Sequence, residues 1–220
     1  MADLFWHATV FVCVGREQSR EYTDSEYIGF MANLRNLPIG ESSPDVVHVV
    51  IEIPKGSRNK IEYDEELEVF KLDRVLFSAV HYPAAYGFIP STRWHDGDPL
   101  DVLVVTDQSL TTGIVLDAIP IGALEMEDDS ENDLKVIAVA AFDPNVNTFT
   151  DYSELPPHRR LEIEQFFETY KMLEKKRVKL GKWLGAAQTR KEIGNARVAF
   201  EKIRPAVDAS ITSSKQAVKT

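Results

Sequence analysis

The sequence predicts an α+β fold, in which a small closed or nearly closed β-barrel is flanked by C-terminal helices. Three observations lead to this prediction. The composition, 44% hydrophobic and 27% charged residues, is that of a globular chain with a sizeable core. Short runs rich in Val and Ile occur within residues 46–142, whereas residues 157–203 repeat their apolar side chains at spacings of three and four. Strands first and helices last are the order of an α+β domain.

The charge and cysteine content exclude several classes of protein. Acidic residues number 35 against 25 Lys and Arg, which gives a formal net charge of −10. Such a field repels phosphate backbones and argues against a nucleic-acid partner. The single cysteine, Cys13, cannot form an intrachain disulfide, which fits a reducing compartment. The most apolar N-terminal run, residues 8–14, is far shorter than the roughly 20 residues that span a bilayer. We therefore expect a cytoplasmic protein with no membrane partner.

The chain divides into three parts. Residues 1–36 mix aromatic and charged side chains without a clean period, and we interpret them as an N-terminal extension. The turn-rich stretch that begins at Leu37 marks entry to the main domain, residues 37–204. Residues 205–220 are polar and are predicted to form a flexible tail.

The predicted strands lie in the first two thirds of the chain. Residues 46–53 are rich in Val and Ile, and at a period of two Glu52 lies on the face opposite the odd-numbered apolar residues. In the next strand the same period places Lys60 and Glu62 together on one face. The complete set of predicted strands is 46–53, 59–64, 67–75, 102–105, 114–118 and 134–142.

The last third predicts two amphipathic helices. Pro156 and Pro157 suit the start of the first helix. Its apolar stripe consists of Ile163, Phe166, Phe167, Tyr170 and Leu173. The second helix is predicted to span residues 183–203, beginning at Trp183. Its inner side is predicted to consist of Ile193, Ala196, Phe200 and Ile203.

The strongest chemical signal is the segment DGDPLD at residues 96–101, which runs directly into an apolar strand. Gly97 permits a tight turn, and Pro99 favours an extended backbone at Asp98. The turn therefore concentrates three carboxylates, those of Asp96, Asp98 and Asp101. Carboxylates this close do not all stay ionised unless a cation neutralises them. A solvated acidic turn is the alternative interpretation of this segment alone.

A second acidic cluster spans residues 125–133 and includes Asp128 and Asp133. Neither cluster has the Gly and Glu that an EF-hand carries at its sixth and twelfth positions. The chain has no Cys pair and no HExxH segment, which argues against zinc. A site of carboxylates alone selects hard divalent cations, chiefly Mg²⁺ or Mn²⁺. The alternative interpretation of this cluster is a solvated hairpin tip.

Basic and phenolic residues accompany the acids. A carboxylate such as Glu52, inside a run of Val and Ile, is costly to bury without partners. The basic and phenolic candidates are Lys60, Arg74, Tyr82, Tyr86, Lys135, Tyr170 and Lys171. Acids that hold metal ions, with cations and phenols that hold an oxyanion, indicate metal-assisted phosphoryl chemistry. The chain has no Walker A loop, no GxGxxG segment and no GxSxG elbow to indicate another chemistry.

Together these segments resemble soluble family I inorganic pyrophosphatases, in particular the prokaryotic type. The segments that carry the resemblance are VIEIP at 50–54, YPAAYG at 82–87, DGDPLD at 96–101 and FFETYK at 166–171. The similarity runs from about Leu37 to Phe200. The resemblance implies an OB-like closed β-barrel and the hydrolysis of pyrophosphate to two phosphates, with several Mg²⁺ ions, or Mn²⁺, in each active site.

The resemblance also implies a role for each candidate residue. The implied metal ligands are Glu52, Glu62, Asp96, Asp101, Asp128 and Asp133. The implied ligands of pyrophosphate and phosphate are Lys60, Arg74, Tyr86, Lys135, Tyr170 and Lys171. Asp98 is implied to accept the proton of the attacking water, and the catalytic set also includes Tyr82, Arg74 and Lys135.

The short core further resembles prokaryotic members that form homohexamers, so we expect a homohexamer rather than the dimer of the longer fungal and animal relatives. Two alternatives to a pyrophosphatase stay open. One is a two-metal phosphomonoesterase or nuclease. The other is a barrel that binds divalent cations or oligonucleotides without turnover.

Overall fold

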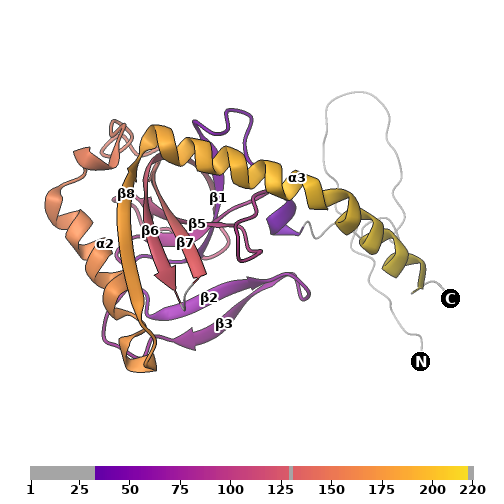
Figure 1. Cartoon of the computed structure of the whole chain (residues 1–220), viewed down its shortest axis with the longest axis horizontal. Coiled ribbons are helices and arrows are strands. Elements are labelled where there is room, and N and C mark those ends of the chain that lie inside the picture. Colours follow the sequence, from indigo (N-terminus) through magenta and orange to yellow (C-terminus); the bar gives the residue numbers. More distant parts are fainter. Residues whose placement is uncertain (1–32, 129–130, 218–220) are drawn as a thin grey trace, which may run out of the picture. The chain divides into compact units, whose positions relative to one another are not determined.

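The computed structural model describes residues 33–128 and 131–217, which form an α+β arrangement, as predicted (Figure 1). Most of the predicted N-terminal extension and Cys13 lie outside the described residues. The strands are β1 (Val47–Ile53), β2 (Asn59–Asp64), β3 (Val69–Val75), β4 (Ala85–Ile89), β5 (Leu100–Val105), β6 (Val115–Asp128), β7 (Glu131–Ala140) and β8 (Val178–Gly185). The helices are α2 (Pro157–Thr169) and α3 (Ala186–Ala217), with 3₁₀ turns η1 (Leu34–Asn36), η2 (Tyr152–Glu154) and η3 (Met172–Glu174). None of the described helices is both long and apolar enough to cross a membrane.

Six strands form one sheet in the order β1-β4-β5-β7-β6-β8. β1 also pairs with β6, so the pairings from β1 through β4, β5, β7 and β6 lead back to β1. The β5–β7 pair is parallel, and its register sets Asp101 directly opposite Lys135. β2 and β3 form a separate two-stranded hairpin, which lies below the larger sheet in Figure 1.

The central strands β5 and β7 are buried on both faces. On β5, Val102 and Val104 belong to a cluster that includes Ile193 of α3. Leu103, the residue between them, belongs to a second cluster that includes Phe167 of α2. Strands covered on both faces read as continuous apolar runs rather than alternating ones, which explains the unbroken run at residues 102–105.

The predicted start of the second helix is wrong, because Trp183 lies in strand β8. β8 pairs antiparallel with β6, and the register sets Trp183 opposite Leu124. Helix α3 begins at Ala186, whose N–H donates to the Asp151 carboxylate at 2.9 Å. This cap comes from 35 residues earlier in the chain, so local pattern did not show where the helix starts. The backbone of α3 then continues through Pro205 to Ala217.

Three further differences concern the ends of elements. Leu173 was predicted on the apolar stripe of the first helix, but α2 ends at Thr169 and Leu173 lies in η3 with 61% of its surface exposed. Strand β4, which follows the Tyr-Pro segment, was not predicted. β6 continues to Asp128 instead of ending at residue 118, so the second acidic cluster lies on the β6–β7 hairpin.

β1 and β4 lie in tight contact at Gly87. This residue pairs with Ile51, and a Cβ atom built at position 87 would lie 1.8 Å from the Val50 carbonyl oxygen. Only a glycine fits between these two strands at this point. The β2–β3 hairpin meets the sheet nearby, where Tyr63 packs in a small cluster with Val50 and Phe88.

Candidate active site

Lys135 is the centre of the candidate site. It lies on β7, and its ammonium is 2.5 Å from Asp101 Oδ2 of β5 and 2.6 Å from Asp133 Oδ2 of β7. Only 5% of its side chain is exposed. Burial by itself would lower the pKa of Lys135, but the carboxylates of Asp101 and Asp133 raise it above its usual range. The amine therefore stays charged, and it neutralises two acids at once.

The acids around Lys135 outnumber it. Burial, opposed by an N–H of Tyr63 at 2.8 Å and reinforced by the Asp101 charge, raises the pKa of Glu52 to about 8. Burial also raises the pKa of Asp133, and the nearby Asp101 and Asp96 carboxylates add to this effect. The pKa of Asp96 is raised in the same way, first by burial and then by its acidic neighbours. A further cation that binds among these carboxylates would stabilise their ionised forms.

Three buried phenols line the same side of the sheet. The ring of Tyr86 lies 5.8 Å from the Lys135 ammonium and 5.4 Å from the ring of Tyr82. Tyr170 stacks on Phe166 of α2 at 5.3 Å. Burial is the main cause that raises the pKa of each of the three tyrosines. Their hydroxyl groups stay protonated at neutral pH and can donate hydrogen bonds to an anion.

Asp128 forms a second centre with Tyr170 and Lys171. The Lys171 ammonium pairs with Asp128 Oδ2, and the Tyr170 hydroxyl donates to the same oxygen at 3.4 Å. The other oxygen, Oδ1, is buried and has no hydrogen-bond partner among the described residues. A buried carboxylate oxygen without a partner is costly and leaves one ligand position free.

The β2–β3 hairpin contributes two cations to the site. Lys60 lies directly opposite Arg74, and both reach Asp73, at 3.4 Å and 2.5 Å. Lys60 also pairs with Glu62, as the predicted shared face requires. Arg74 Nε donates to Glu174 of η3 at 3.1 Å. Two like charges that face each other across a hairpin are held by acids on both sides and are available to an anion.

The acidic turn is held by hydrogen bonds of its own backbone N–H groups. The N–H of Trp94 donates to the Asp98 carbonyl at 2.8 Å, and the N–H of Asp98 donates to the Asp96 carboxylate at 2.9 Å. The indole N–H of Trp94 donates to the Asn132 carbonyl of β7 at 3.2 Å, which holds the turn against the strand that carries Asp133. The Asp98 side chain is 65% exposed and pairs with Arg35 rather than with Lys135.

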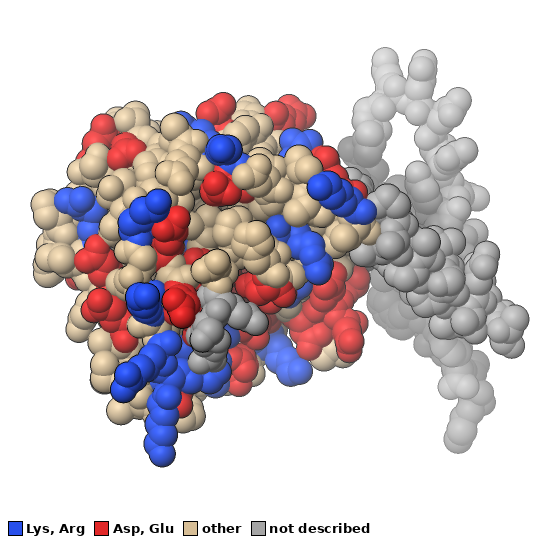
Figure 2. Space-filling model, in the orientation of Figure 1, with Lys and Arg blue, Asp and Glu red and all other residues tan. Residues whose placement is uncertain are grey.

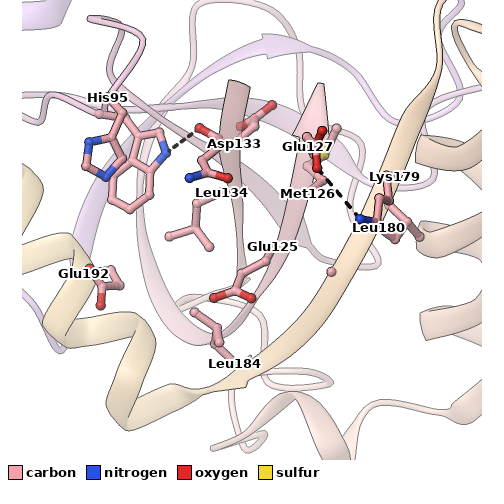
Figure 3. Close-up of a pocket in the computed structure, with 13 residues that line it drawn as sticks. His95, Glu125, Met126, Glu127, Asp133, Leu134, Lys179, Leu180, Leu184 and Glu192 are labelled. Atoms are coloured by element: carbon pink, nitrogen blue, oxygen red, sulfur yellow. Dashed lines mark hydrogen bonds and ion pairs between the residues drawn. The ribbon is translucent and has the colours of Figure 1, made fainter. Parts of the chain in front are cut away.

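A cavity of about 410 Å³ lies beside the site, between β6, β8 and the start of α3. Figure 3 shows His95, Glu125 and Glu192 around this cavity. Asp133 is the one predicted site residue among its lining residues, so the predicted acids and bases gather elsewhere. The face drawn in Figure 2 carries both acidic and basic side chains, with a group of Lys and Arg at its lower left.

The donor set suits a divalent metal ion. Within residues 33–128 and 131–217, no three His, Cys, Asp or Glu side chains are arranged to enclose a metal. The Asp101 and Asp133 oxygens face Lys135 instead. The donors are nonetheless all carboxylate oxygens, and they include the partnerless Oδ1 of Asp128. Burial, and then their acidic neighbours, raise the pKa values of Asp96 and Asp133. Hard oxygen donors of this kind are complementary to Mg²⁺ or Mn²⁺.

Comparison with known proteins gives a consistent result. The model of the inorganic pyrophosphatase family matches residues 49–201. The chain belongs to the inorganic pyrophosphatase family. The inorganic pyrophosphatase of Thermus thermophilus is 46% identical over 177 residues, which are 80% of this chain and 97% of that protein. The soluble inorganic pyrophosphatase 2 of Chlamydomonas reinhardtii is 47% identical over 154 residues, which are 70% of this chain and 80% of that protein.

The solved pyrophosphatase structures agree in fold. The crystal structure of the Thermus thermophilus enzyme has a TM-score of 0.76 at 44% identity, and the match covers 77% of this chain and 99% of that chain. A Helicobacter pylori pyrophosphatase structure has a TM-score of 0.72 at 40% identity and covers 75% of this chain and 98% of that chain. The family predicted from the sequence is therefore confirmed, while the individual roles of the site residues stay predictions.

Three residues of this pyrophosphatase site were not predicted from the sequence. Asp73 and Glu174 hold Arg74, and Arg35 holds Asp98. Each is an ordinary charged residue outside the recognisable motifs, and Glu174 is 100 positions away from its partner. The one usable signal was the position of Asp73 beside Arg74, because an acid next to a proposed phosphate ligand suggests an orienting partner.

Proposed function

We propose that this chain catalyses the hydrolysis of inorganic pyrophosphate to two phosphates and needs divalent metal ions, chiefly Mg²⁺, to do so. The observation that carries the proposal is the buried Lys135 ammonium between the Asp101 and Asp133 carboxylates. A cation at this place suits a phosphate oxygen, and the surplus of acids around it suits the metal ions that accompany a polyphosphate. Membership of the pyrophosphatase family supports the same reaction.

In this proposal the carboxylates hold the metal ions and the cations and phenols hold the substrate. The proposed metal ligands are Glu52, Glu62, Asp96, Asp101, Asp128 and Asp133. The proposed phosphate ligands are Lys60, Arg74, Tyr86, Lys135, Tyr170 and Lys171. Bound metal ions make the attacking water more acidic and neutralise charge on both reacting oxygens.

The chain's own residues account for the proton and the leaving group. Asp98 takes a proton from the attacking water as the oxygen of that water forms a bond to one phosphorus. The bond from that phosphorus to the bridging oxygen breaks, and the second phosphate leaves with the electron pair. Arg74 and Lys135 stabilise the negative charge on the phosphates, and the Tyr82 hydroxyl is a neutral donor beside them. Arg74 pairs with Glu174, Lys135 pairs with Asp101 and Tyr82 packs on Tyr86, while Asp98 pairs with Arg35.

Four finer features belong to the same proposal. The return of the strand pairings to β1 supports an OB-like closed barrel, and the family match supports a main domain at residues 37–204. The prokaryotic resemblance supports a homohexamer, for which a light-scattering mass of one or two chains would be contrary evidence. The single cysteine supports a cytoplasmic location.

Phosphate release tests the reaction directly. We expect release from pyrophosphate with Mg²⁺, none with EDTA, and little from nucleotides or single-stranded DNA. Ca²⁺ in place of Mg²⁺ should bind and inhibit, because its longer, irregular coordination acidifies water less. Absence of release with Mg²⁺ would reject the proposal, and faster release from nucleotides would favour the phosphomonoesterase alternative.

A further inference from the structure

The segment that precedes β1 is fixed against two parts of the active-site rim. Asn33 Nδ2 donates to Glu65 at 2.8 Å, and the N–H of Leu34 donates to the Tyr63 hydroxyl at 3.2 Å. Both acceptors belong to the β2–β3 hairpin or its turn. On the other side, the Ser91 N–H donates to the Arg35 carbonyl at 2.8 Å. The backbone at Arg35 is therefore held by hydrogen bonds to the β2–β3 hairpin on one side and to Ser91 on the other.

The Arg35 guanidinium connects the hairpin turn to the acidic turn. Its Nη1 is 3.0 Å from Asp98 Oδ1 and 3.5 Å from Glu65 Oε2. The Arg35 side chain is 27% exposed, whereas that of Asp98 is 65% exposed. Among the described residues, Arg35 is the partner of the Asp98 carboxylate. A side chain this exposed has several rotamers open to it, and an ion pair with a fixed guanidinium selects among them.

The charge of Arg35 also reaches the interior of the site. Burial dominates the pKa of Glu52 and raises it, and Arg35 is among the groups that act in the opposite direction. Arg35 thus lies close enough to influence an acid of β1 as well as the two acids that it contacts.

We propose that Arg35 is a positioning residue, which holds the Asp98 carboxylate in the orientation that the attacking water requires. This inference rests on the proposed function, because it assigns Asp98 the proton of that water. It predicts that loss of Arg35 affects turnover more than substrate binding. A displacement of about 1 Å of a reacting group can cost up to about 10²-fold in rate.

A competing interpretation is that Arg35 occupies a place that a metal ion takes over when it binds. The two interpretations predict opposite effects. Removal of a positioning residue lowers kcat and leaves the Mg²⁺ requirement unchanged. Removal of a cation that competes with the metal lowers the Mg²⁺ concentration needed for half-maximal rate and leaves kcat unchanged.

The test is steady-state phosphate release by Arg35→Ala, Arg35→Lys and wild type across pyrophosphate and Mg²⁺ titrations. We expect kcat of Arg35→Ala to fall about tenfold, with KM and the Mg²⁺ requirement within about twofold of wild type. Arg35→Lys should recover part of the loss, because a single ammonium can still pair with Asp98. Arg197→Ala is the matched control, because that guanidinium pairs with Glu201 at 3.0 Å on α3. Its kcat should equal that of wild type.

A double-mutant cycle with Asp98→Asn keeps the inference independent of folding. If Arg35 acts through Asp98, Arg35→Ala should add little further loss in the Asp98→Asn background. Losses that multiply would overturn the proposal, as would an unchanged kcat in Arg35→Ala or a lowered Mg²⁺ requirement at unchanged kcat. An inactive wild type would reject the proposed function together with this inference, whereas an active wild type with an insensitive Arg35→Ala would reject this inference alone.

Discussion

The parallel pair of β5 and β7 has a polar cluster at each end, and the two clusters are built differently. At the end where β5 begins, Asp101 and Asp133 face one ammonium, that of Lys135. At the end where both strands stop, Asp143 accepts a hydrogen bond from the Thr106 hydroxyl at 2.8 Å and others from backbone N–H groups.

The pKa values of the acids at the two ends shift in opposite directions. The pKa of Asp133 is raised, first by burial and then by the acids around it. The pKa of Asp143 is lowered, first by the backbone N–H of Asp107 and then by the Thr106 hydroxyl and the N–H of Asn145. Neutral donors at fixed positions satisfy the hydrogen-bonding capacity of a carboxylate, which then stabilises the fold. Carboxylates that share one cation stay able to bind another, which suits a site for metal ions.

The largest expected effect concerns the acidic turn at the first end. Asp98→Asn keeps the shape of the side chain but removes the proton acceptor, so we expect kcat to fall about 10²–10⁴-fold. Added Mg²⁺ should not restore it. Asp101→Asn removes a proposed metal ligand, and higher Mg²⁺ should recover part of its loss. The measurement is kcat of both variants across a Mg²⁺ titration. Rescue of Asp98→Asn to the same degree would show that Asp98 is another metal ligand.

The next effect tests the shared cation itself. Lys135→Met keeps most of the unbranched side chain but leaves Asp101 and Asp133 without their ammonium. We expect kcat to fall about 10²–10³-fold, because a preorganised charge at the reacting phosphate is lost. The thermal midpoint in EDTA should also fall, and Mg²⁺ should raise it more than it raises that of wild type. A variant with near-wild-type kcat would place the substrate elsewhere.

At the other end of the strands, a change should affect stability and leave turnover alone. Asp143→Asn retains the size of the side chain but accepts hydrogen bonds less strongly, so we expect the thermal midpoint to fall by about 2–4 °C at neutral pH. Because the folded-state pKa of Asp143 lies below its usual 3.8, its stabilisation is present above that pH and is lost as the pH falls through the lowered value. The difference between the variant and wild type should therefore shrink below pH 3.8.

Thermal melts from pH 3 to 8, with kcat measured at neutral pH as the second readout, check this prediction. A loss of kcat in Asp143→Asn, at a temperature where the variant is folded, would remove the functional difference between the two ends.

The smallest effect concerns the fixation of the acidic turn. Trp94→Phe removes the indole N–H that donates to the Asn132 carbonyl at 3.2 Å. Because the hydrogen bonds from the backbone N–H groups of the turn remain, we expect kcat to fall only about two- to threefold, in line with one neutral hydrogen bond. Trp183→Phe is a matched substitution whose indole bonds Glu164 at 2.6 Å outside the turn, and its kcat should stay closer to wild type. An equal loss in both variants would mean that this anchor has no special role.

The chemistry of the site was more accessible from the sequence than its construction. Residues within the DGDPLD turn lie close in sequence, so their clustering could be predicted, and it was. The direct pairing of Asp101 with Lys135 depends on a parallel register between strands that are not adjacent in the chain. Arg35 and Glu174 contact site residues that are 63 and 100 positions away in the sequence. Local sequence periodicity cannot predict such contacts.

Errors in the predicted elements have a similar origin. Trp183 lies in a strand because β6 is available as its partner, and apolar spacing alone does not reveal that partner. Leu173 fitted the helical stripe, yet the chain leaves the α-helix after Tyr170, and Lys175 adopts a left-handed φ of 61°. Strand pairing determines the structure at Trp183, and the turn after α2 determines it at Leu173. Neither can be predicted from apolar spacing in a short window of sequence.

The contact at Gly87 limits which sequences this enzyme can adopt. Every other amino acid carries a Cβ atom, which would fall 1.8 Å from the Val50 carbonyl oxygen. Glycine is therefore the only amino acid that fits at position 87. We expect a library of variants at this position to contain only glycine among its active members. The constraint on Gly87 is steric and differs in kind from that on its neighbour Tyr86, which is a proposed phosphate ligand. The requirement at position 87 is thus one of shape, whereas the acids of the site are required for their charge.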